Sequence, residues 1–207
     1  MYARSSTIMA EPSSIDSGIA YLRDEVMPQL SEFDGWVGLS MMMNRATGRC
    51  IATTAWDSED ALRASRLRVH PLRDGLSLTL GGQVEQIDEW DVAVMHRDHL
   101  AGPRACTRCT WIQVDPGGVD NAIETFKTTL LPRFEGMDGF RSASLFVDRS
   151  TGRAVGSTVW SSIEELEASR EEADRMRMAA AENLGAEIQD VAEFRLGFAH
   201  LRVPELV

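Results

Sequence analysis

The side chains of this 207-residue chain that are best suited to acid–base chemistry are three histidines. His96 and His200 end two similar apolar segments, and His70 precedes Pro71. Because an imidazole titrates near neutral pH, each could act as a general base or donate a hydrogen bond to a ligand. Alternatively, His96 and His200 could be structural residues at the rim of a sheet, with no catalytic role. The alternative for His70 is a solvent-facing helix end, where the helix dipole favours a cation.

Aromatic and thioether side chains indicate an apolar binding surface. Trp56 and Trp160 occur in the same local pattern, each just before a segment of helix-forming residues. They could stack on a flat aromatic ligand or pack under the helix that follows. Trp90 lies on the same strand face as the first strand-end histidine. Met41 and Met43 could line an adaptable pocket, because thioethers are flexible, or fill the core.

Arg195 is an unusual charge within a strand pattern, and it could bind an anionic ligand or pair with Asp91 or Glu89. Cys106 and Cys109 form a lone C-x-x-C. Residues three apart on a strand point to opposite faces, and no second cysteine pair completes a zinc site, so we expect ordinary thiols. No nucleotide-binding loop or catalytic elbow is present in the sequence. We therefore expect neither a metal nor a nucleotide cofactor.

Composition narrows the classes of partner. The formal net charge is −11, and such a field repels a phosphate backbone, so nucleic acid is a poor partner. Hydrophobic residues make up 43% of the chain, which is enough for a folded core. No apolar run approaches the roughly 20 residues that span a membrane, and the N-terminus does not resemble a signal peptide. We therefore expect a cytoplasmic protein with no nucleic-acid or membrane partner.

The chain contains one unit twice, at a constant offset of 104 residues. Gly48 aligns with Gly152 in "RATGR" and "RSTGR", and the two tryptophans and the two strand-end histidines described above align as well. The alignment needs no gap, and about a quarter of the aligned positions are identical. A period this long argues against a solenoid. It predicts two equal domains, residues 1–102 and 103–207.

Hydrophobic periodicity predicts the same elements in each repeat. A first strand is expected near 3–10 and 107–114. An amphipathic helix follows, kinked or restarted at Pro28 and Pro132. The glycine-containing turns then indicate a hairpin of two strands. A second helix begins near 58 and 162, and a fourth strand covers 83–96 and 187–200.

The second helix is expected to differ between the repeats. In the second repeat it is rich in helix formers and runs unbroken to Gly185. In the first repeat Pro71 and Gly75 interrupt it, so it should end near His70 and resume irregularly. Asp57 and Ser161 are expected to be its N-caps.

The order β-α-β-β-α-β in each repeat is that of the ferredoxin-like fold, which belongs to the α+β class. With helices on one face, the other face of each sheet needs cover, and the second copy can supply it. We therefore expect two ferredoxin-like units packed sheet to sheet as a pseudo-dimeric α/β barrel within one chain. The space between the sheets would hold a ligand, and the pseudo-dimer could associate further into a homodimer.

Two pairs of segments resemble the dimeric α/β-barrel superfamily. "PQLSEFDGW" and "PRFEGMDGF" are similar to the end of its first helix. "AWDSEDALRAS" and "VWSSIEELEAS" are similar to its junction of third strand and second helix. Within the superfamily the chain resembles the antibiotic biosynthesis monooxygenase (ABM) group, as a tandem fusion of two units. The resemblance covers nearly the whole chain.

The ABM resemblance implies a monooxygenase without metal or nucleotide cofactor, acting on a hydrophobic or aromatic small molecule in the inter-sheet pocket. One of the three histidines would deprotonate the substrate, and the carbanion would react with O₂ between tryptophan walls. Haem breakdown is disfavoured, because neither first strand has the Asn and neither second helix has the Trp of the haem-degrading branch. The alternative is a non-catalytic small-molecule-binding or stress-related protein that uses the same cavity.

Overall fold

The computed structural model describes residues 1–202 and 204–206, and the chain forms two compact units. The first unit holds Met1–Trp90 and Arg195–Val203, and the second holds Asp91–Phe194 and Pro204–Val207. The strands β4 (Gln83–Arg97) and β8 (Glu187–Leu201) therefore each begin in one unit and end in the other. This division of the chain differs from the one that the repeat predicts, at residue 102.

The two units contain the same elements in the same order. The first has β1 (Tyr2–Met9), η1 (Pro12–Ser14), α1 (Ile15–Tyr21), η2 (Leu22–Val26), α2 (Met27–Leu30), β2 (Trp36–Met43), β3 (Arg49–Trp56), α3 (Glu59–Ala64) and α4 (Arg66–Thr79). The second has β5 (Cys106–Gln113), η3 (Pro116–Gly118), α5 (Val119–Thr125), η4 (Phe126–Leu130), α6 (Leu131–Glu135), β6 (Phe140–Asp148), β7 (Arg153–Trp160), α7 (Ile163–Ala168) and α8 (Arg170–Leu184). Each element starts 104 residues after its counterpart, which is the offset of the sequence alignment.

Each sheet has the ferredoxin-like strand order, extended by one strand. The order is β4-β1-β3-β2-β8 in the first unit and β8-β5-β7-β6-β4 in the second. In the first unit the end of β8 pairs antiparallel with β2, with Met41 opposite Phe198. In the second unit the end of β4 pairs antiparallel with β6, with Val92 opposite Phe146. The α+β class and the ferredoxin-like units predicted from the sequence are confirmed.

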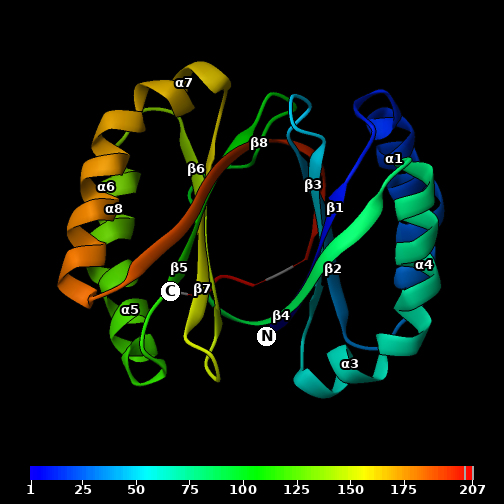
Figure 1. The fold of residues 1–207 in the computed structure, drawn as a ribbon, viewed down its shortest axis with the longest axis horizontal. Helices are drawn as coiled ribbons and strands as arrows, with labels where there is room; N and C mark the ends of the chain where they lie inside the picture. Colours follow the sequence, from blue (N-terminus) through cyan, green and yellow to red (C-terminus); the bar gives the residue numbers. More distant parts are fainter. Residues whose placement is uncertain (203, 207) are drawn as a thin grey trace. The chain divides into compact units, whose positions relative to one another are not determined.

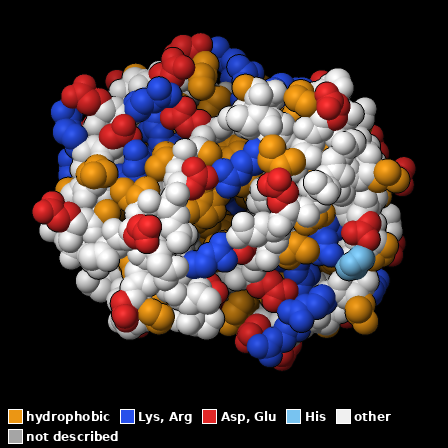
Figure 2. Space-filling model, viewed as in Figure 1, with side chains coloured by type: hydrophobic (Ala, Val, Ile, Leu, Met, Phe, Trp, Pro, Cys, Tyr) orange, Lys and Arg blue, Asp and Glu red, His pale blue; other side chains and the backbone are white. Residues whose placement is uncertain are grey.

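Helices cover one face of each sheet and bury a separate core beneath them. In Figure 1, α1 and α4 lie against the sheet of the first unit, and α5, α6 and α8 lie against the sheet of the second. Trp56 is fully buried in the first core and Trp160 in the second. On one face of the molecule, charged side chains of both signs are interspersed (Figure 2). No helix in the described ranges is long and apolar enough to cross a membrane.

The first helix of each unit contains a π-helical stretch just before its proline. The stretch is η2 before Pro28 and η4 before Pro132. Proline has no N–H to donate, and its ring clashes with the carbonyl four residues earlier, so the preceding turn widens. The predicted kink is therefore present, in the form of a wider turn within a continuous helical segment.

The prediction that Pro71 and Gly75 break the second helix of the first unit was wrong. α4 runs through both residues, and its partner α8 ends at the predicted Gly185, which has a φ of 61°. Pro71 deprives only the carbonyl of the exposed Leu67, which water can solvate. Gly75 serves packing instead, because a Cβ there would lie 2.2 Å from the Tyr21 hydroxyl oxygen.

The break in the second helix falls at Ser65 and Ser169, in both units, so the expected unbroken helix of the second repeat was also wrong. The N-caps lie one residue later than predicted. Ser58 accepts a hydrogen bond from the Ala61 N–H, and Ser162 accepts one from the Glu165 N–H. A serine with extended backbone at this position satisfies one of the open N–H groups of the helix.

We expect Gly48→Ala to lower the free energy of unfolding by about 1–3 kcal/mol, measured by urea denaturation. Gly48 has a φ of 78°, and a Cβ there would lie 2.3 Å from the Ala10 carbonyl oxygen, which is rigid backbone. The matched control is Gly102→Ala, because a Cβ at that position meets no atom within 4 Å. Equal stability of the two variants would contradict the argument.

Candidate functional site

The second unit contains an apolar pocket between its sheet and its helices. Its cavity volume is about 90 Å³. The strands β5, β6 and β7 form the floor, and α5, η4 and α8 form the walls. Phe126 and Leu130 of the π-helical stretch line it, so the widened turn before Pro132 contributes part of the wall. A pocket of this kind, apolar with a few polar groups, is the usual form of a small-molecule site.

The corresponding space in the first unit is nearly filled, with a cavity volume of about 30 Å³. The two linings differ at equivalent positions, which are 104 residues apart. Ala180 and Ala173 of α8 stand where α4 has Leu76 and Val69. Gly156 of β7 stands where β3 has Ala52. At these three positions the second unit has the smaller residue, whereas its Phe126, Leu130 and Phe134 are larger than the equivalent Leu22, Val26 and Leu30.

A buried arginine forms one end of this pocket. Arg108 is 3% exposed. Its Nε and Nη2 donate to Glu193 Oε1 at 3.0 and 2.8 Å, its Nη1 donates to Ser169 Oγ at 3.0 Å, and its Nη2 donates to the Leu166 carbonyl at 2.7 Å. Arg170 pairs with the other oxygen of Glu193 at 2.8 Å. These bonds hold the end of α7, the start of α8 and β8 to the first strand of the unit.

The first unit has the same network. Arg4 donates to Glu89, Ser65 and the Leu62 carbonyl, and Arg66 pairs with Glu89 at 2.9 Å. Partial burial alone would raise the pKa of Glu89, but the hydrogen bonds and charges of Arg4 and Arg66 outweigh it and hold that pKa below its usual range. Glu89 is therefore ionised near neutral pH.

Two further groups of the pocket can recognise a polar ligand atom. Arg177 of α8 lines the pocket, with its side chain 17% exposed, and pairs with Asp174. The Thr158 Oγ1 accepts a hydrogen bond from Trp160 Nε1 at 3.1 Å. Because a hydroxyl can accept and donate at the same time, Thr158 can also donate its O–H to a ligand. Trp160 does not line this pocket and reaches it only through Thr158, and its role as a wall between the two sheets stays a prediction.

The three predicted histidines lie away from both pockets, and the lining of neither pocket includes a histidine. The exposed His70 has its Nδ1 3.0 Å from Asp74. His96 lies between two carboxylates, with Nε2 2.8 Å from Glu135 and Nδ1 2.7 Å from Glu205, although neither contact has hydrogen-bond alignment. Their roles as bases stay predictions.

His200 and His96 share one packing arrangement. The ring of His200 stacks on Trp36 at a centroid distance of 5.7 Å and an interplanar angle of 3°. The ring of His96 stacks on Phe140, the equivalent of Trp36, at 6.4 Å and 14°. The repeated stacking is what the alternative reading, a histidine at the rim of the sheet, would produce.

The other predicted binding residues also lie outside the two pockets. Met41, Met43 and Trp56 belong to the core of the first unit. Trp90 is buried on β4 and donates a hydrogen bond to Ser5 Oγ at 2.9 Å. Arg195 is exposed on β8. Its two proposed partners pair elsewhere, Glu89 as described above and Asp91 with Arg149. A binding role between the two sheets stays a prediction for these residues.

The cysteines are buried, and none of the three forms a disulfide. Burial raises the pKa of the Cys50 thiol to about 11, so this thiol stays protonated near neutral pH. Cys109 lies 3.3 Å from Ser157 Oγ, whereas Cys106 belongs to the core under the helices. Within residues 1–202 and 204–206, no group of three or more His, Cys, Asp or Glu side chains could hold a metal ion.

Sequence reasoning did not identify the arginines of the pocket. A signal was available, because Arg4 and Arg108 are identical and 104 residues apart, as are Arg73 and Arg177. A charged residue that is kept twice within a strand pattern indicates a buried, hydrogen-bonded role, since an unpaired buried charge is costly.

No protein-family model matches the chain. Two relatives from Mycobacterium tuberculosis (strain H37Rv) match it over its whole length. The uncharacterised protein Rv2557 is 47% identical over 207 residues, which cover 100% of this chain and 92% of that protein. The uncharacterised protein Rv2558 is 48% identical over 208 residues, which cover 100% of this chain and 88% of that protein.

Solved structures show the same fold at low sequence identity. A "Putative monooxygenase (FN1347)" from Fusobacterium nucleatum has a TM-score of 0.71 at 12% identity, covering 97% of this chain and 94% of that one. An anthrone oxidase-like protein has a TM-score of 0.66 at 16% identity, and the match covers 99% of this chain and 95% of that one. A ferredoxin-fold protein of Listeria monocytogenes, related to antibiotic biosynthesis monooxygenases, has a TM-score of 0.53 at 8% identity, covering 95% of both. The fold is therefore that of the ABM and dimeric α/β-barrel proteins, as the sequence predicted.

We expect Glu89→Gln to remove part of the pH dependence of stability. Because the pKa of Glu89 is lower in the folded state, its ionisation stabilises the fold above the unfolded pKa of about 4.3, and this contribution is lost as the pH falls through the folded pKa. Thermal melts between about pH 7 and pH 3 should show a large difference between wild type and variant at neutral pH, shrinking in acid.

The matched control is Glu32→Gln, at an exposed position in the turn after α2. Its melting temperature should follow that of the wild type at every pH. A gap between wild type and Glu89→Gln that stays constant from neutral pH to acid would show that the carboxylate charge is not what stabilises the network.

Proposed function

We propose that this chain, which belongs to the family of the Mycobacterium tuberculosis proteins Rv2557 and Rv2558, binds a hydrophobic or aromatic small molecule in the second-unit pocket. The observation that carries the proposal is the asymmetry between the units. Two copies of one scaffold have nearly identical elements, yet the second has the larger pocket, with Ala173, Ala180 and Gly156 in place of larger residues. An unfilled apolar space lowers the stability of a protein. The first unit fills the equivalent space with leucine and valine, so the open space in the second unit supports a role in ligand binding.

The size of the pocket limits the ligand. A cavity of about 90 Å³ is smaller than the roughly 150 Å³ cavity that holds a benzene molecule in an engineered protein. A single ring or a short branched chain therefore enters with only small movements of Phe126, Leu130 or Leu184. The walls supply apolar contact, and the arginines and threonines at the pocket supply orientation.

We expect Ala180→Leu to abolish binding without unfolding the protein. Leucine already occupies the equivalent position in the first unit, as Leu76, so the scaffold accommodates it. The measurement is an NMR titration with a panel of monocyclic aromatic compounds, acids and neutral compounds together. The affinity of the variant for any bound member should fall by more than about tenfold, because the space is filled.

Ala179→Leu is the matched control, because Ala179 is exposed on the same helix and does not line the pocket. It should bind as the wild type does. Binding that is equally strong in Ala180→Leu would place the ligand elsewhere, and a panel in which no compound binds the wild type would contradict the proposal.

A second candidate function is oxygenation of the bound molecule, as in a monooxygenase without metal or nucleotide cofactor. It is favoured by the match, over nearly the full chain, to structures named as a monooxygenase and an anthrone oxidase-like protein. A phenol and O₂ would give a quinone and water: the ring C–H becomes C=O with one oxygen atom, and the other oxygen atom leaves as water with the two hydrogens. The guanidinium groups of Arg108 and Arg177 would stabilise the phenolate oxygen.

For this second candidate we expect oxygen uptake with a monocyclic phenol, measured with an oxygen electrode and by mass spectrometry after ¹⁸O₂ labelling. Ala180→Leu should lose the uptake. His70→Ala, His96→Ala and His200→Ala should keep it, because the lining of the pocket includes no histidine and water can accept the proton. Loss of uptake in one histidine variant would instead assign the base to that residue, and absence of uptake in the wild type would leave binding alone.

A further inference from the structure

The two charged side chains that line the second-unit pocket, Arg108 and Arg177, are both positive. Their carboxylate partners, Glu193 and Asp174, do not line it. Arg170, which also pairs with Glu193, is half exposed and lies outside the lining. Arg108 is 3% exposed, so its charge is screened weakly by water and acts strongly on whatever occupies the adjoining apolar space.

Hydrogen-bonding capacity is also left over at the pocket. A guanidinium has five N–H groups, and four hydrogen bonds from Arg108 go to acceptors among the described residues. One N–H of Nη1 remains for an oxygen of a ligand. The Thr158 O–H is a second donor, and Arg177 is a third, at the helix wall. All these groups donate, so the ligand atom that satisfies them is an acceptor.

The first unit shows how the pair of arginines behaves without such an acceptor. Arg73 lines the smaller pocket beside Arg4, as Arg177 lines the larger one beside Arg108. Burial lowers the pKa of Arg73, the charge of Asp74 opposes that change, and the positive charge of Arg4 lowers the pKa further. The two guanidinium groups are thus close enough to repel. An anion between them would turn this repulsion into attraction.

We propose that the ligand of the second-unit pocket is a compact organic monocarboxylate, whose carboxylate oxygens accept hydrogen bonds from Arg108, Arg177 and Thr158 while its apolar body lies against Phe126 and Leu130. This inference rests on the proposed function and names its ligand class. Because Arg108 and Arg177 each already have a carboxylate partner outside the pocket, a monoanion is the smallest charge that both can share. A phosphate group carries about two negative charges at neutral pH and would bring more uncompensated charge into an apolar site.

The experiment compares phenylacetate with phenylacetamide, which has nearly the same shape and no charge. Both are titrated into the full chain at pH 7 and followed by NMR and calorimetry. We expect phenylacetate to bind at least about tenfold more tightly, because hydrogen bonds to a charged group contribute more than neutral ones. Equal binding of the two compounds, or tighter binding of the amide, would overturn the carboxylate inference.

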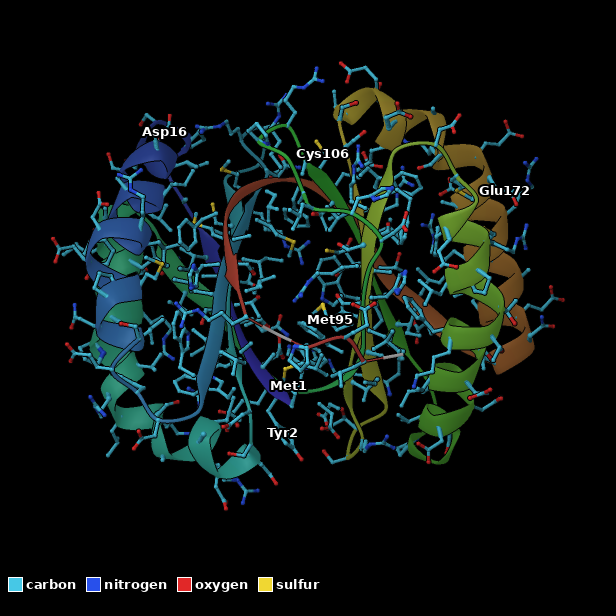
Figure 3. The ribbon with its side chains drawn as sticks, turned by 180° about the vertical axis from the view of Figure 1, so that it is seen from behind. Met1, Tyr2, Asp16, Met95, Cys106 and Glu172 are labelled. Carbon is cyan, nitrogen blue, oxygen red and sulfur yellow. The ribbon has the colours of Figure 1, made fainter. Side chains whose placement is uncertain are left out.

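The variant Arg177→Gln tests whether Arg177 recognises the carboxylate group of the ligand. It keeps a donor and removes the charge, so the affinity for phenylacetate should fall about tenfold while the affinity for phenylacetamide stays the same. The matched control is Arg175→Gln on the same helix. Arg175 pairs with Glu171 and with Glu172, which lies on the solvent side of α8 in Figure 3, and it does not line the pocket. An equal loss in both variants, or a loss for both ligands, would overturn the assignment of Arg177.

Failure of this inference and failure of the proposed function give different results. If phenylacetamide and neutral aromatic compounds bind and are excluded by Ala180→Leu, the pocket is a ligand site but its ligand is not a carboxylate. If no acid and no neutral compound binds, the second-unit pocket is not a ligand site, and both proposals fall.

Discussion

A buried arginine on the first strand of each unit sets conditions that the rest of the fold must meet. A guanidinium that is 3% exposed is tolerated only if its N–H groups have acceptors and its charge has a counter-ion. Arg4 and Arg108 obtain them from a glutamate on the fourth strand, a serine and a helix carbonyl. The serine and the carbonyl lie where the second helix breaks. The network thus fixes the position of the fourth strand and the direction of the second helix together.

The same scaffold then serves two purposes, because packing above the arginine can change without disturbing it. In the first unit the large side chains Val69, Leu72 and Leu76 complete a dense core. In the second unit Ala173 and Ala180 leave a space next to Arg108. The two units therefore differ in packing. The core of the first unit is filled, which favours stability. The second unit keeps a polar group beside an apolar pocket and loses some packing energy.

The histidines that look most suited to catalysis have partners of another kind. His96 and His200 stack on aromatic rings at equivalent positions, and two carboxylates flank His96. Glu205, one of these carboxylates, belongs to the C-terminal segment, which also bridges Met95 through Leu206. These contacts attach the end of the chain to β4 within the second unit. The roles of His96 and His200 as bases stay predictions.

The sequence by itself determined the order of strands and helices and the 104-residue repeat, because hydrophobic periodicity and turn residues act over short distances along the chain. It also determined the fold family, through segments such as "AWDSEDALRAS". Only the tertiary structure decided that Pro71 stays within a helix, that Trp160 supports Thr158, and that Arg108 and Arg177 meet at one pocket. These outcomes depend on which side chains meet across strands and helices, and on the volume that remains between them. Local sequence patterns do not contain that information.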